Sequence, residues 1–253
     1  IVLQEKRPAP PILAPHFVQY VIESVDARLG DGYTGRAGLT ITTTLDLSMQ
    51  QLAQQIVTAS VADLLPQYDL SNAALVVMRP NSGEILTMVG SADFNNTAIA
   101  GQVNVATSLR QPGSAIKPVL YATAFNDNLI SPATVLWDVP VTYTVSANAN
   151  GEKQIYRPQN YDNSFHGAVS VRTALANSYN IPSVKLLDEV GVNRMLASAR
   201  AMGVQSLNKP SEWYGLSLTL GGGDVTLLDL TTAFHTLASA GQYWPAKPIL
   251  SLR

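Results

Sequence analysis

Hydrophobic and polar positions along this chain change between strand-like and helix-like spacing in a definite order. Residues 39–45 are rich in β-branched side chains, which predicts a strand. Asp46 follows directly and is suited to cap a helix, because its carboxylate can accept a hydrogen bond from a backbone N–H of the first turn. Apolar side chains then recur at helical spacing, at Met49, Leu52, Ala53, Ile56 and Val57. This part of the chain therefore predicts a strand that leads into a helix.

A hairpin is predicted at residues 74–90. Residues 74–79 and 84–90 are rich in strand-forming side chains, and the Pro-Asn-Ser-Gly between them is a turn sequence whose glycine can adopt a positive φ. We expect these segments to supply two neighbouring antiparallel strands of a core sheet.

Helical spacing dominates the rest of the chain. Residues 131–163 are irregular apart from a predicted strand at 139–145. Helices are predicted at 171–177, 181–190 and 193–202. A last helix before Gly241 is predicted to bury one face, made of Leu227, Leu230, Phe234, Leu237 and Ala238. Clustered helices and antiparallel strand pairs predict an α+β fold, in which an antiparallel sheet packs against a helical cluster.

The first 38 residues are predicted as a module of their own. Prolines gather at the beginning and glycines at the end of this segment, around an apolar stretch at residues 17–25. That composition is typical of a linker. We expect a linker or docking segment at residues 1–38 and a domain at residues 39–253.

Composition narrows the classes of function. With 253 residues, 46% hydrophobic and 13% charged, the chain can bury a sizeable core. Lys and Arg total 16 against 18 Asp and Glu, without basic runs, which argues against a nucleic-acid or anionic-membrane partner. The absence of cysteine excludes disulfides, thiolate metal ligands and a cysteine nucleophile. His16, His166 and His235 lack the spacing of a metal-ligand pair, so we expect no metal and no cofactor.

Ser114 and Lys117 are the leading candidates for chemistry. Gly113 allows an abrupt turn and Pro118 fits only in a first helical turn, so a helix is predicted to start near Ser114. Residues three apart on a helix share a face. A lysine partly removed from water can accept the proton of a serine, and a helix amino terminus favours the oxyanion of acyl transfer. The pair therefore indicates acyl transfer through a serine ester.

The short pattern also occurs elsewhere, at Ser206 and Lys209. Ser114 opens a run with apolar side chains on one helix face, whereas Ser206 leads into Pro210 and a loop composition. Context thus favours the first pair, although a helix cap with a solvated lysine is the alternative interpretation. Three consecutive glycines at 221–223 lack the Lys and Ser/Thr of a phosphate loop and predict tight backbone packing.

Ser178 and Asn180 form a second candidate. A serine and lysine site needs a hydroxyl to relay protons and an amide to hold a substrate amide. The same short pattern occurs at residues 146–148 and 206–208, but only residues 178–180 fall at a predicted junction between two helices. A helix stop followed by a new cap is the alternative interpretation.

Ser-x-x-Lys and Ser-x-Asn are the first two of three motifs in penicillin-interacting serine enzymes, and both pairs above match them. The flanking residues match as well, at 110–118, 156–162, 167–180 and 218–226. Over nearly its whole length the chain resembles the transpeptidase domain of class A penicillin-binding proteins. Residues 14–18 and 39–46 resemble the linker that follows the glycosyltransferase domain in that family.

The resemblance implies a penicillin-binding transpeptidase-like fold, related to serine β-lactamases, and a D,D-transpeptidase that cross-links peptidoglycan stem peptides. Ser114 would attack the carbonyl of the penultimate D-Ala, and Lys117 would accept its proton. Ser178 would relay a proton to the leaving group, and Asn180 would hold the substrate amide. β-Lactams would acylate the same serine.

The resemblance also implies a setting. The parent would be a bifunctional glycosyltransferase and transpeptidase, anchored in the bacterial inner membrane by a segment absent here. It would act on the periplasmic or extracytoplasmic face and could meet other cell-wall synthesis proteins. No cofactor is implied.

The sequence departs from the family in one respect, because no Lys-Thr-Gly occurs in it. That strand would contact the substrate carboxylate and supply one oxyanion donor, and losing such a donor costs about a hundredfold or more in rate. Residues 241–245 lead toward the place where the family continues, and the chain stops at Arg253. We expect a C-terminally incomplete domain rather than a complete active enzyme.

Three other functions remain open. A β-lactamase would need a carboxylate to activate water, and Glu189 is near the second motif, but the predicted helix at 181–190 makes it a surface charge. A D,D-carboxypeptidase shares every motif and differs only in using water as the acceptor. A noncatalytic module could recognise muropeptides or β-lactams, or serve as a scaffold. Acylation at Ser114 separates this last alternative from the enzymes.

Overall fold

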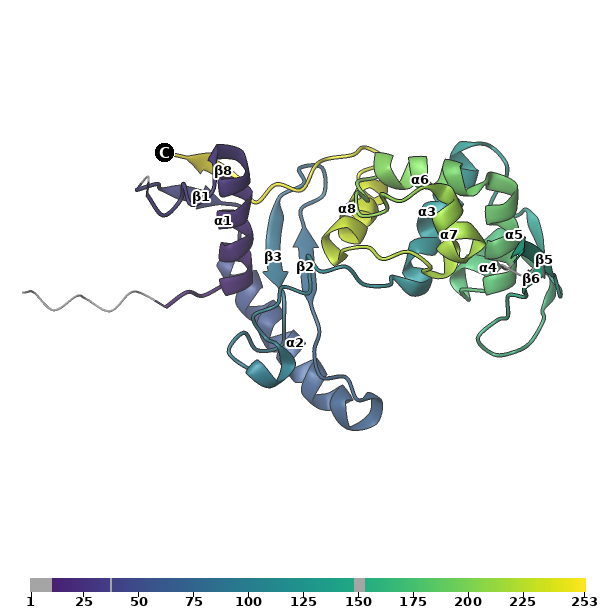
Figure 1. The fold of residues 1–253 in the computed structure, drawn as a ribbon, viewed down its shortest axis with the longest axis horizontal. Helices are drawn as coiled ribbons and strands as arrows, with labels where there is room; N and C mark the ends of the chain where they lie inside the picture. Colours follow the sequence, from purple (N-terminus) through teal and green to yellow (C-terminus); the bar gives the residue numbers. More distant parts are fainter. Residues whose placement is uncertain (1–10, 37, 148–152) are drawn as a thin grey trace, which may run out of the picture. The chain divides into compact units, whose positions relative to one another are not determined.

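The computed structural model describes residues 11–36, 38–147 and 153–253 (Figure 1). Contacts divide the chain into two compact units. The first runs to Thr107 and includes Ala246–Arg253, and the second is Ser108–Pro245. The boundary expected near residue 38 is a different one, because it separates a linker or docking segment from a domain, and it stays a prediction.

The first unit combines helices with two strand pairs. Its elements are α1 (Pro15–Leu29), β1 (Ile41–Thr43), α2 (Leu47–Tyr68), β2 (Leu75–Met78), β3 (Ile85–Val89), the 3₁₀ helix η1 (Thr97–Ile99) and β8 (Ile249–Leu252). The predicted hairpin is confirmed, because β2 and β3 pair antiparallel. Asp46 caps α2 as predicted, accepting from the Met49 N–H at 3.0 Å.

The segment at residues 1–38, expected as a linker or docking segment, contains a helix at residues 15–29. They form α1, and Pro15 is compatible with its first turn. Phe17, Val21 and Val25 recur every four residues and are all buried. The prolines and glycines thus flank a helix. Residues 1–10 of the predicted linker lie outside the described residues.

The buried face of α2 differs from the predicted one. Ala53 and Val57 are buried, but Leu52 and Ile56 are 56% and 48% exposed. Gln50 takes an inner position because its amide both accepts from Met88 N at 2.9 Å and donates to Met88 O at 3.1 Å. A polar side chain whose hydrogen bonds are satisfied can therefore occupy a core position that the apolar pattern did not reveal.

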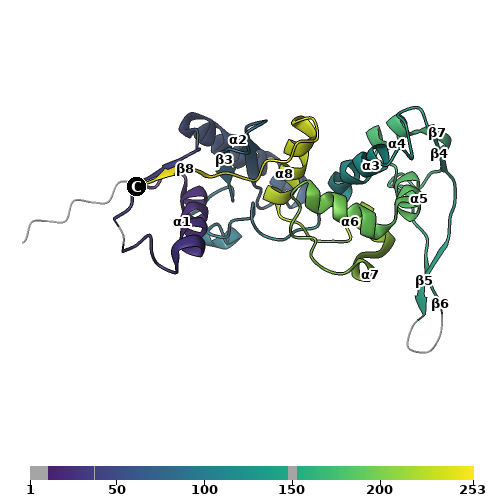
Figure 2. The ribbon, with the colours of Figure 1, turned by 90° about the horizontal axis from the view of Figure 1, so that it is seen from above.

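The second unit is mainly helical (Figure 2). Its helices are η2 (Gly113–Ile116), α3 (Lys117–Asn126), α4 (Val171–Ala176), α5 (Asn180–Val190), α6 (Val192–Ala201), α7 (Ser211–Tyr214), η3 (Gly215–Leu220) and α8 (Leu227–Ala238). The helices predicted at 171–177, 181–190 and 193–202 are confirmed as α4, α5 and α6. These helices pack around α3, which contacts α4, α5 and α6.

The core of the second unit lies along α3. Ile116, Val119, Leu120 and Ala124 are each fully buried, and Tyr121 is 1% exposed. Burying a large apolar side chain contributes about 1.5–3 kcal/mol. The helix that follows Ser114 is therefore well packed in the core of this unit.

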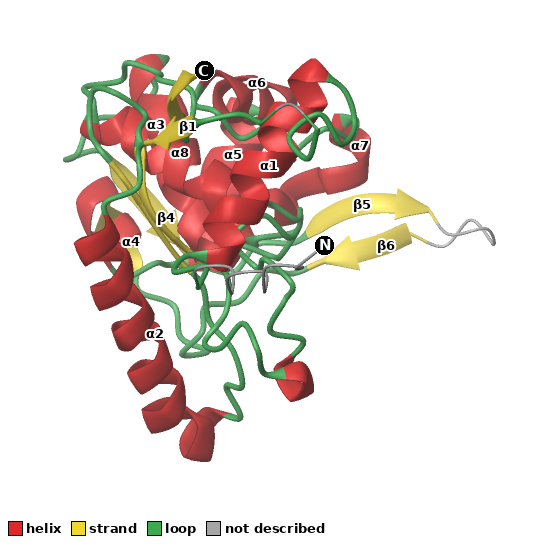
Figure 3. Cartoon of the chain, turned by 90° about the vertical axis from the view of Figure 1, so that its left-hand side faces the viewer, coloured by secondary structure: helices red, strands yellow, loops and turns green. Residues whose placement is uncertain are grey.

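The strands of the second unit are β4 (Val135–Asp138), β5 (Tyr143–Ala147), β6 (Lys153–Tyr156) and β7 (Gly167–Ser170). β4 pairs with β7 and β5 with β6, both antiparallel, and the β5–β6 hairpin extends away from the helices (Figure 3). The strand predicted at 139–145 overlaps only the start of β5. The α+β class is confirmed, but the described residues form four two-stranded sheets instead of one core sheet.

The predicted inner face of α8 was also wrong. Phe234 and Leu237 are 42% and 39% exposed, whereas Thr232 and Thr236 are buried. Thr232 can face inward because its hydroxyl donates to Leu228 O at 2.8 Å within the helix.

Among the described residues, no helix combines the length and apolar character needed to cross a membrane.

Candidate active site

Ser114 lies in the short 3₁₀ turn η2, directly before α3. Gly113 has φ +56°, which provides the predicted abrupt turn, and Pro118 lies in the first turn of α3. The predicted helix start is therefore confirmed to within a few residues. Ser114 is exposed, and no hydrogen bond of its hydroxyl occurs among the described residues.

Lys117 is almost completely removed from water, with 1% of its surface exposed. Its Nζ donates to Ser178 O at 2.5 Å, and its other acceptors are Ser178 Oγ at 3.1 Å, Tyr179 O at 3.3 Å and Asn180 Oδ1 at 2.7 Å. Burial disfavours the charged form and lowers the pKa of Lys117 from 10.5 to about 8. The ammonium is thus held in place, and it loses its proton at a lower pH than an exposed lysine does.

Ser178 adopts an unusual backbone conformation, with φ +55°. It lies between α4 and α5, where Ser178 N donates to Leu175 O at 3.0 Å and Tyr179 N donates to Ala174 O at 2.9 Å. A left-handed residue other than glycine costs about 1–3 kcal/mol and persists when surrounding contacts fix it. This turn lets both the carbonyl and the hydroxyl of Ser178 contact Lys117.

Asn180 contributes the third side chain of the cluster. Its Nδ2 donates to Gln159 O at 2.8 Å, and this bond leaves Oδ1 to accept from Lys117. The structure therefore brings Lys117, Ser178 and Asn180 into direct contact, with Ser114 three residues before Lys117. Residues around Gln159 were not predicted as site residues, because a backbone carbonyl carries no sequence signal.

The glycines at 221–223 pack against the segment that carries Ser114. A Cβ on Gly221 would lie 2.4 Å from Gly113 N, which no real side chain tolerates. Arg110 and Val225 exchange two backbone hydrogen bonds of 2.9 Å and join the same two segments. The predicted tight backbone packing at 221–223 is confirmed.

The second Ser-x-x-Lys pair has a different environment. The N–H and the hydroxyl of Ser206 both donate to Asp229 Oδ2 at 2.7 Å, and Lys209 is exposed in a loop. Glu189 is exposed on α5, as the surface-charge interpretation predicted. Of the pattern at 146–148, Asn148 lies outside the described residues.

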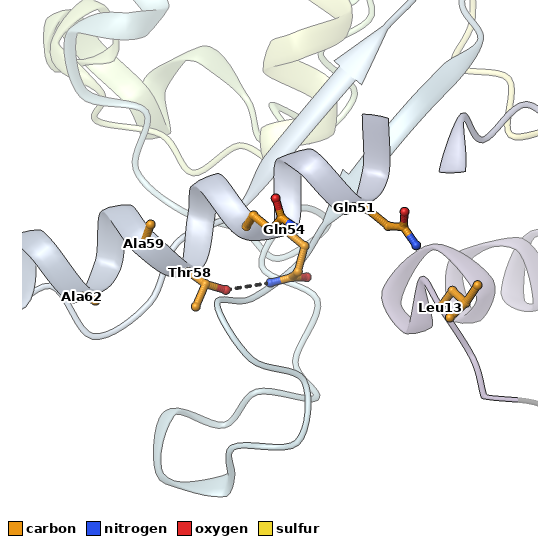
Figure 4. Close-up of a pocket in the computed structure, with 7 residues that line it drawn as sticks. Leu13, Gln51, Gln54, Thr58, Ala59 and Ala62 are labelled. Carbon is orange, nitrogen blue, oxygen red and sulfur yellow. Dashed lines mark hydrogen bonds between the residues drawn. The ribbon is translucent and has the colours of Figure 1, made fainter. Parts of the chain in front are cut away.

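Other parts of the structure offer less chemistry. No group of His, Cys, Asp and Glu among the described residues could hold a metal ion. A hollow of about 700 Å³ in the first unit runs along α2 (Figure 4). It is lined by Leu13, Gln51, Gln54, Gln55, Thr58, Ala59 and Ala62. These side chains include neither an ionisable group nor an activated nucleophile.

Comparison with known proteins gives related sequences. Residues 73–250 match the penicillin binding protein transpeptidase domain. The chain is 34% identical to penicillin-binding protein 1C of Escherichia coli (strain K12) over 202 residues, 80% of this chain and 24% of that protein. It is 31% identical to penicillin-binding protein 1B of Vibrio cholerae serotype O1 over 245 residues, 94% of this chain and 30% of that protein. The chain thus spans less than a third of the length of these relatives.

Solved structures show the same fold. Penicillin-binding protein PonA1 from Mycobacterium tuberculosis has a TM-score of 0.75 at 20% identity, over 94% of this chain and 60% of that one. Penicillin-binding protein 1A from Haemophilus influenzae has a TM-score of 0.76 at 17% identity, over 95% and 48% of the two chains. The sequence motifs had also indicated likeness to penicillin-binding protein 1C in particular, and a relative of that name is among those found. Because the family match covers more than half of the chain, this protein belongs to the penicillin-binding protein transpeptidase family.

Proposed function

We propose that this chain forms acyl-serine intermediates as the transpeptidase part of a peptidoglycan cross-linking enzyme. The observation that supports this proposal is the environment of Lys117. Its amine is buried, has a pKa lowered to about 8 and donates hydrogen bonds to Ser178 and Asn180. The exposed Ser114 lies three residues earlier in the sequence. An amine in that state can act as a general base near neutral pH.

The proposed reaction has two halves. Ser114 Oγ attacks the carbonyl carbon of the penultimate D-Ala, while Lys117 Nζ takes the hydroxyl proton. The C–N bond then breaks, Ser178 relays a proton to the departing D-Ala amine, and the donor peptide remains as a Ser114 ester. Asn180 holds the substrate amide. In the second half an amine from another stem peptide attacks the ester, which forms the cross-link and returns the proton to Ser114.

The wider setting is part of the proposal. One of the solved structures is the PonA1 protein in complex with penicillin V. We infer that β-lactams acylate Ser114 here because they imitate the D-Ala-D-Ala amide. Peptidoglycan lies outside the cytoplasmic membrane, so the domain would work on the extracytoplasmic side, and its parent would also carry a glycosyltransferase. Water as the acceptor would make the enzyme a D,D-carboxypeptidase.

Intact-mass spectrometry after incubation with a broad β-lactam tests the proposal. We expect one adduct per chain, lost in Ser114→Ala and formed at least a hundredfold more slowly in Lys117→Ala, because a general base contributes about 10²–10⁴-fold. The second Ser-x-x-Lys pair supplies the matched control, since Ser206→Ala and Lys209→Ala should react like the wild type.

Two results would contradict the proposal. An adduct that survives in Ser114→Ala would place the nucleophile elsewhere. No adduct, both on this chain and on a longer form that carries a Lys-Thr-Gly segment, would leave a noncatalytic module as the better interpretation.

A further inference from the structure

A buried carboxylate lies behind the Ser178–Asn180 segment. Asp138, the last residue of β4, has no exposed surface. Its two oxygens accept from Asn160 Nδ2 at 2.9 and 2.8 Å, and Oδ2 also accepts from His166 N at 3.0 Å and contacts His166 Nδ1 at 2.6 Å. A buried charge needs such partners to be tolerated, so this carboxylate fixes the side chains around it.

The amide of Asn160 has only one possible orientation in this arrangement. Its Nδ2 donates to Asp138 and to Ser164 O at 2.8 Å, so its Oδ1 must face the opposite way. There Oδ1 accepts from Asn180 N at 2.8 Å and lies 3.4 Å from Ile181 N. Asp138 therefore determines where Asn160 presents its oxygen.

This oxygen replaces the missing cap of α5. The first N–H groups of a helix have no partner within it. Tyr179 holds the N-cap position of α5 but makes no side-chain cap bond. Asn160 satisfies the N–H of Asn180 from 20 residues earlier in the sequence. The start of α5 is thus fixed from a separate loop.

The same loop also fixes the Asn180 side chain. Gln159 O accepts from Asn180 Nδ2, and Asn180 Oδ1 then accepts from Lys117 Nζ at 2.7 Å. Adjacent residues of one loop therefore hold both the backbone and the amide of Asn180. An unbroken series of hydrogen bonds runs from Asp138 through Asn160 and Asn180 to Lys117.

Tyr179 is held from a second side by a histidine. The rings of His166 and Tyr179 stack at 4.0 Å with an interplanar angle of 15°. The two ring nitrogens of His166 lie 2.6 Å from Asp138 Oδ2 and 3.1 Å from Asp162 Oδ2. Asp138 therefore reaches the middle residue of the motif through His166 as well.

We propose that Asp138 and Asn160 are positioning residues of this site, which set Ser178, Tyr179 and Asn180 against Lys117. This inference rests on the proposed function for its catalytic consequence. Neither residue touches Lys117, so both act through the backbone and amide of Asn180 and, for Asp138, through His166.

Three variants test the proposal in the whole chain. Asn160→Ala removes the oxygen that caps Asn180, and Asp138→Asn keeps the size of the side chain but removes the carboxylate. Asp229→Asn is the matched control, because Asp229 also accepts two hydrogen bonds in this unit but from Ser206. Thermal unfolding of each variant measures any general loss of stability.

β-Lactam acylation provides the catalytic readout, separated into the affinity of the noncovalent complex and the acylation rate constant. We expect Asn160→Ala and Asp138→Asn to lower the rate constant at least tenfold while affinity changes less than threefold. Asp229→Asn should stay within twofold in both. Rate constants within twofold of the wild type in folded Asn160→Ala or Asp138→Asn would overturn the inference.

Amide hydrogen exchange measured by NMR provides a readout that does not depend on acylation. We expect the amides of Asn180 and Ile181 to exchange at least tenfold faster in Asn160→Ala, with Leu186 and Leu187 of the same helix unchanged. Equal acceleration along the whole of α5 would reduce Asn160 to a general structural role and overturn the inference. If neither this chain nor the longer form that carries a Lys-Thr-Gly segment is acylated, the proposed function fails, and the exchange result still decides the positioning.

Discussion

At the residue scale, the titration of Lys117 should be visible in the stability of the protein. Its pKa falls from 10.5 to about 8 on burial. Between these two values the unfolded chain binds more protons than the folded chain, so this residue makes the free energy of unfolding rise with pH. Its unfavourable effect is constant below about pH 8 and disappears above about pH 10.5.

The measurement is urea unfolding of the wild type and of Lys117→Met from pH 7 to pH 11. Tyrosines such as Tyr121, whose pKa is raised by burial, titrate in both chains and cancel in the difference. The free energy of the wild type relative to Lys117→Met should increase through the window from pH 8 to 10.5. A difference that stays constant across this window would show that burial leaves the Lys117 pKa unchanged.

The same residues show what sequence can reveal. Ser114 and Lys117 were identifiable because a local signal, Gly113 before them and Pro118 after them, fixes the start of their helix. Asn160 gave no such signal, since its importance comes from partners 20 and 22 residues away along the chain. Long-range hydrogen bonds of this kind depend on how loops meet in three dimensions.

At the element scale, the contact between η2 and the loop after η3 predicts a strong effect of Gly221→Ala. The new Cβ would lie 2.4 Å from Gly113 N and 2.6 Å from Gly113 Cα, and φ at Gly221 is +92°. The left-handed conformation costs about 1–2 kcal/mol, and overpacking adds about 1–3 kcal/mol. Because Gly113 precedes Ser114, acylation should slow at least tenfold.

Gly241→Ala is the matched control. Gly241 has φ +84°, but nothing lies within 4 Å of its Cβ position. It should lose only about 1–2 kcal/mol in urea unfolding and acylate at the wild-type rate. Equal stability losses in the two variants would argue that Gly221 is required for its backbone conformation alone, without a role in holding η2.

Elements were predictable where their ends carry a chemical signal. Asp46 marks the start of α2, and Gly203, with φ +100°, comes directly after the helix predicted at 193–202. The inner faces of α2 and α8 were not predictable, because Gln50 and Thr232 have hydrogen-bond partners and can replace apolar residues there. Apolar periodicity measures hydrophobicity alone, so it misses buried polar groups with local partners.

At the scale of the whole molecule, the hydrogen bonds of the candidate site lie within one of the two units. Lys117, Ser178 and Asn180 and all the hydrogen bonds described for them lie within Ser108–Pro245. The last residues belong instead to the first unit, where β8 pairs with β1. Removing residues 246–253 should therefore weaken hydrogen bonds in the first unit and leave those of the candidate site unchanged.

Truncation after Pro245 tests this separation. It removes the acceptor Lys247 O, which receives bonds from Ile85 N at 3.0 Å and Thr44 Oγ1 at 3.0 Å, and it removes the partner strand of β1. Exposed strand edges and lost partners lower local protection, so amides of β1 and of Ile85 should exchange at least tenfold faster by mass spectrometry or NMR. Protection around Asn180 should stay at the wild-type level, because its partners Asn160, Gln159 and Lys117 remain. Faster exchange at Asn180 would instead show that the first unit stabilises the site. The acylation rate of the truncated chain should then be lower than that of the full chain.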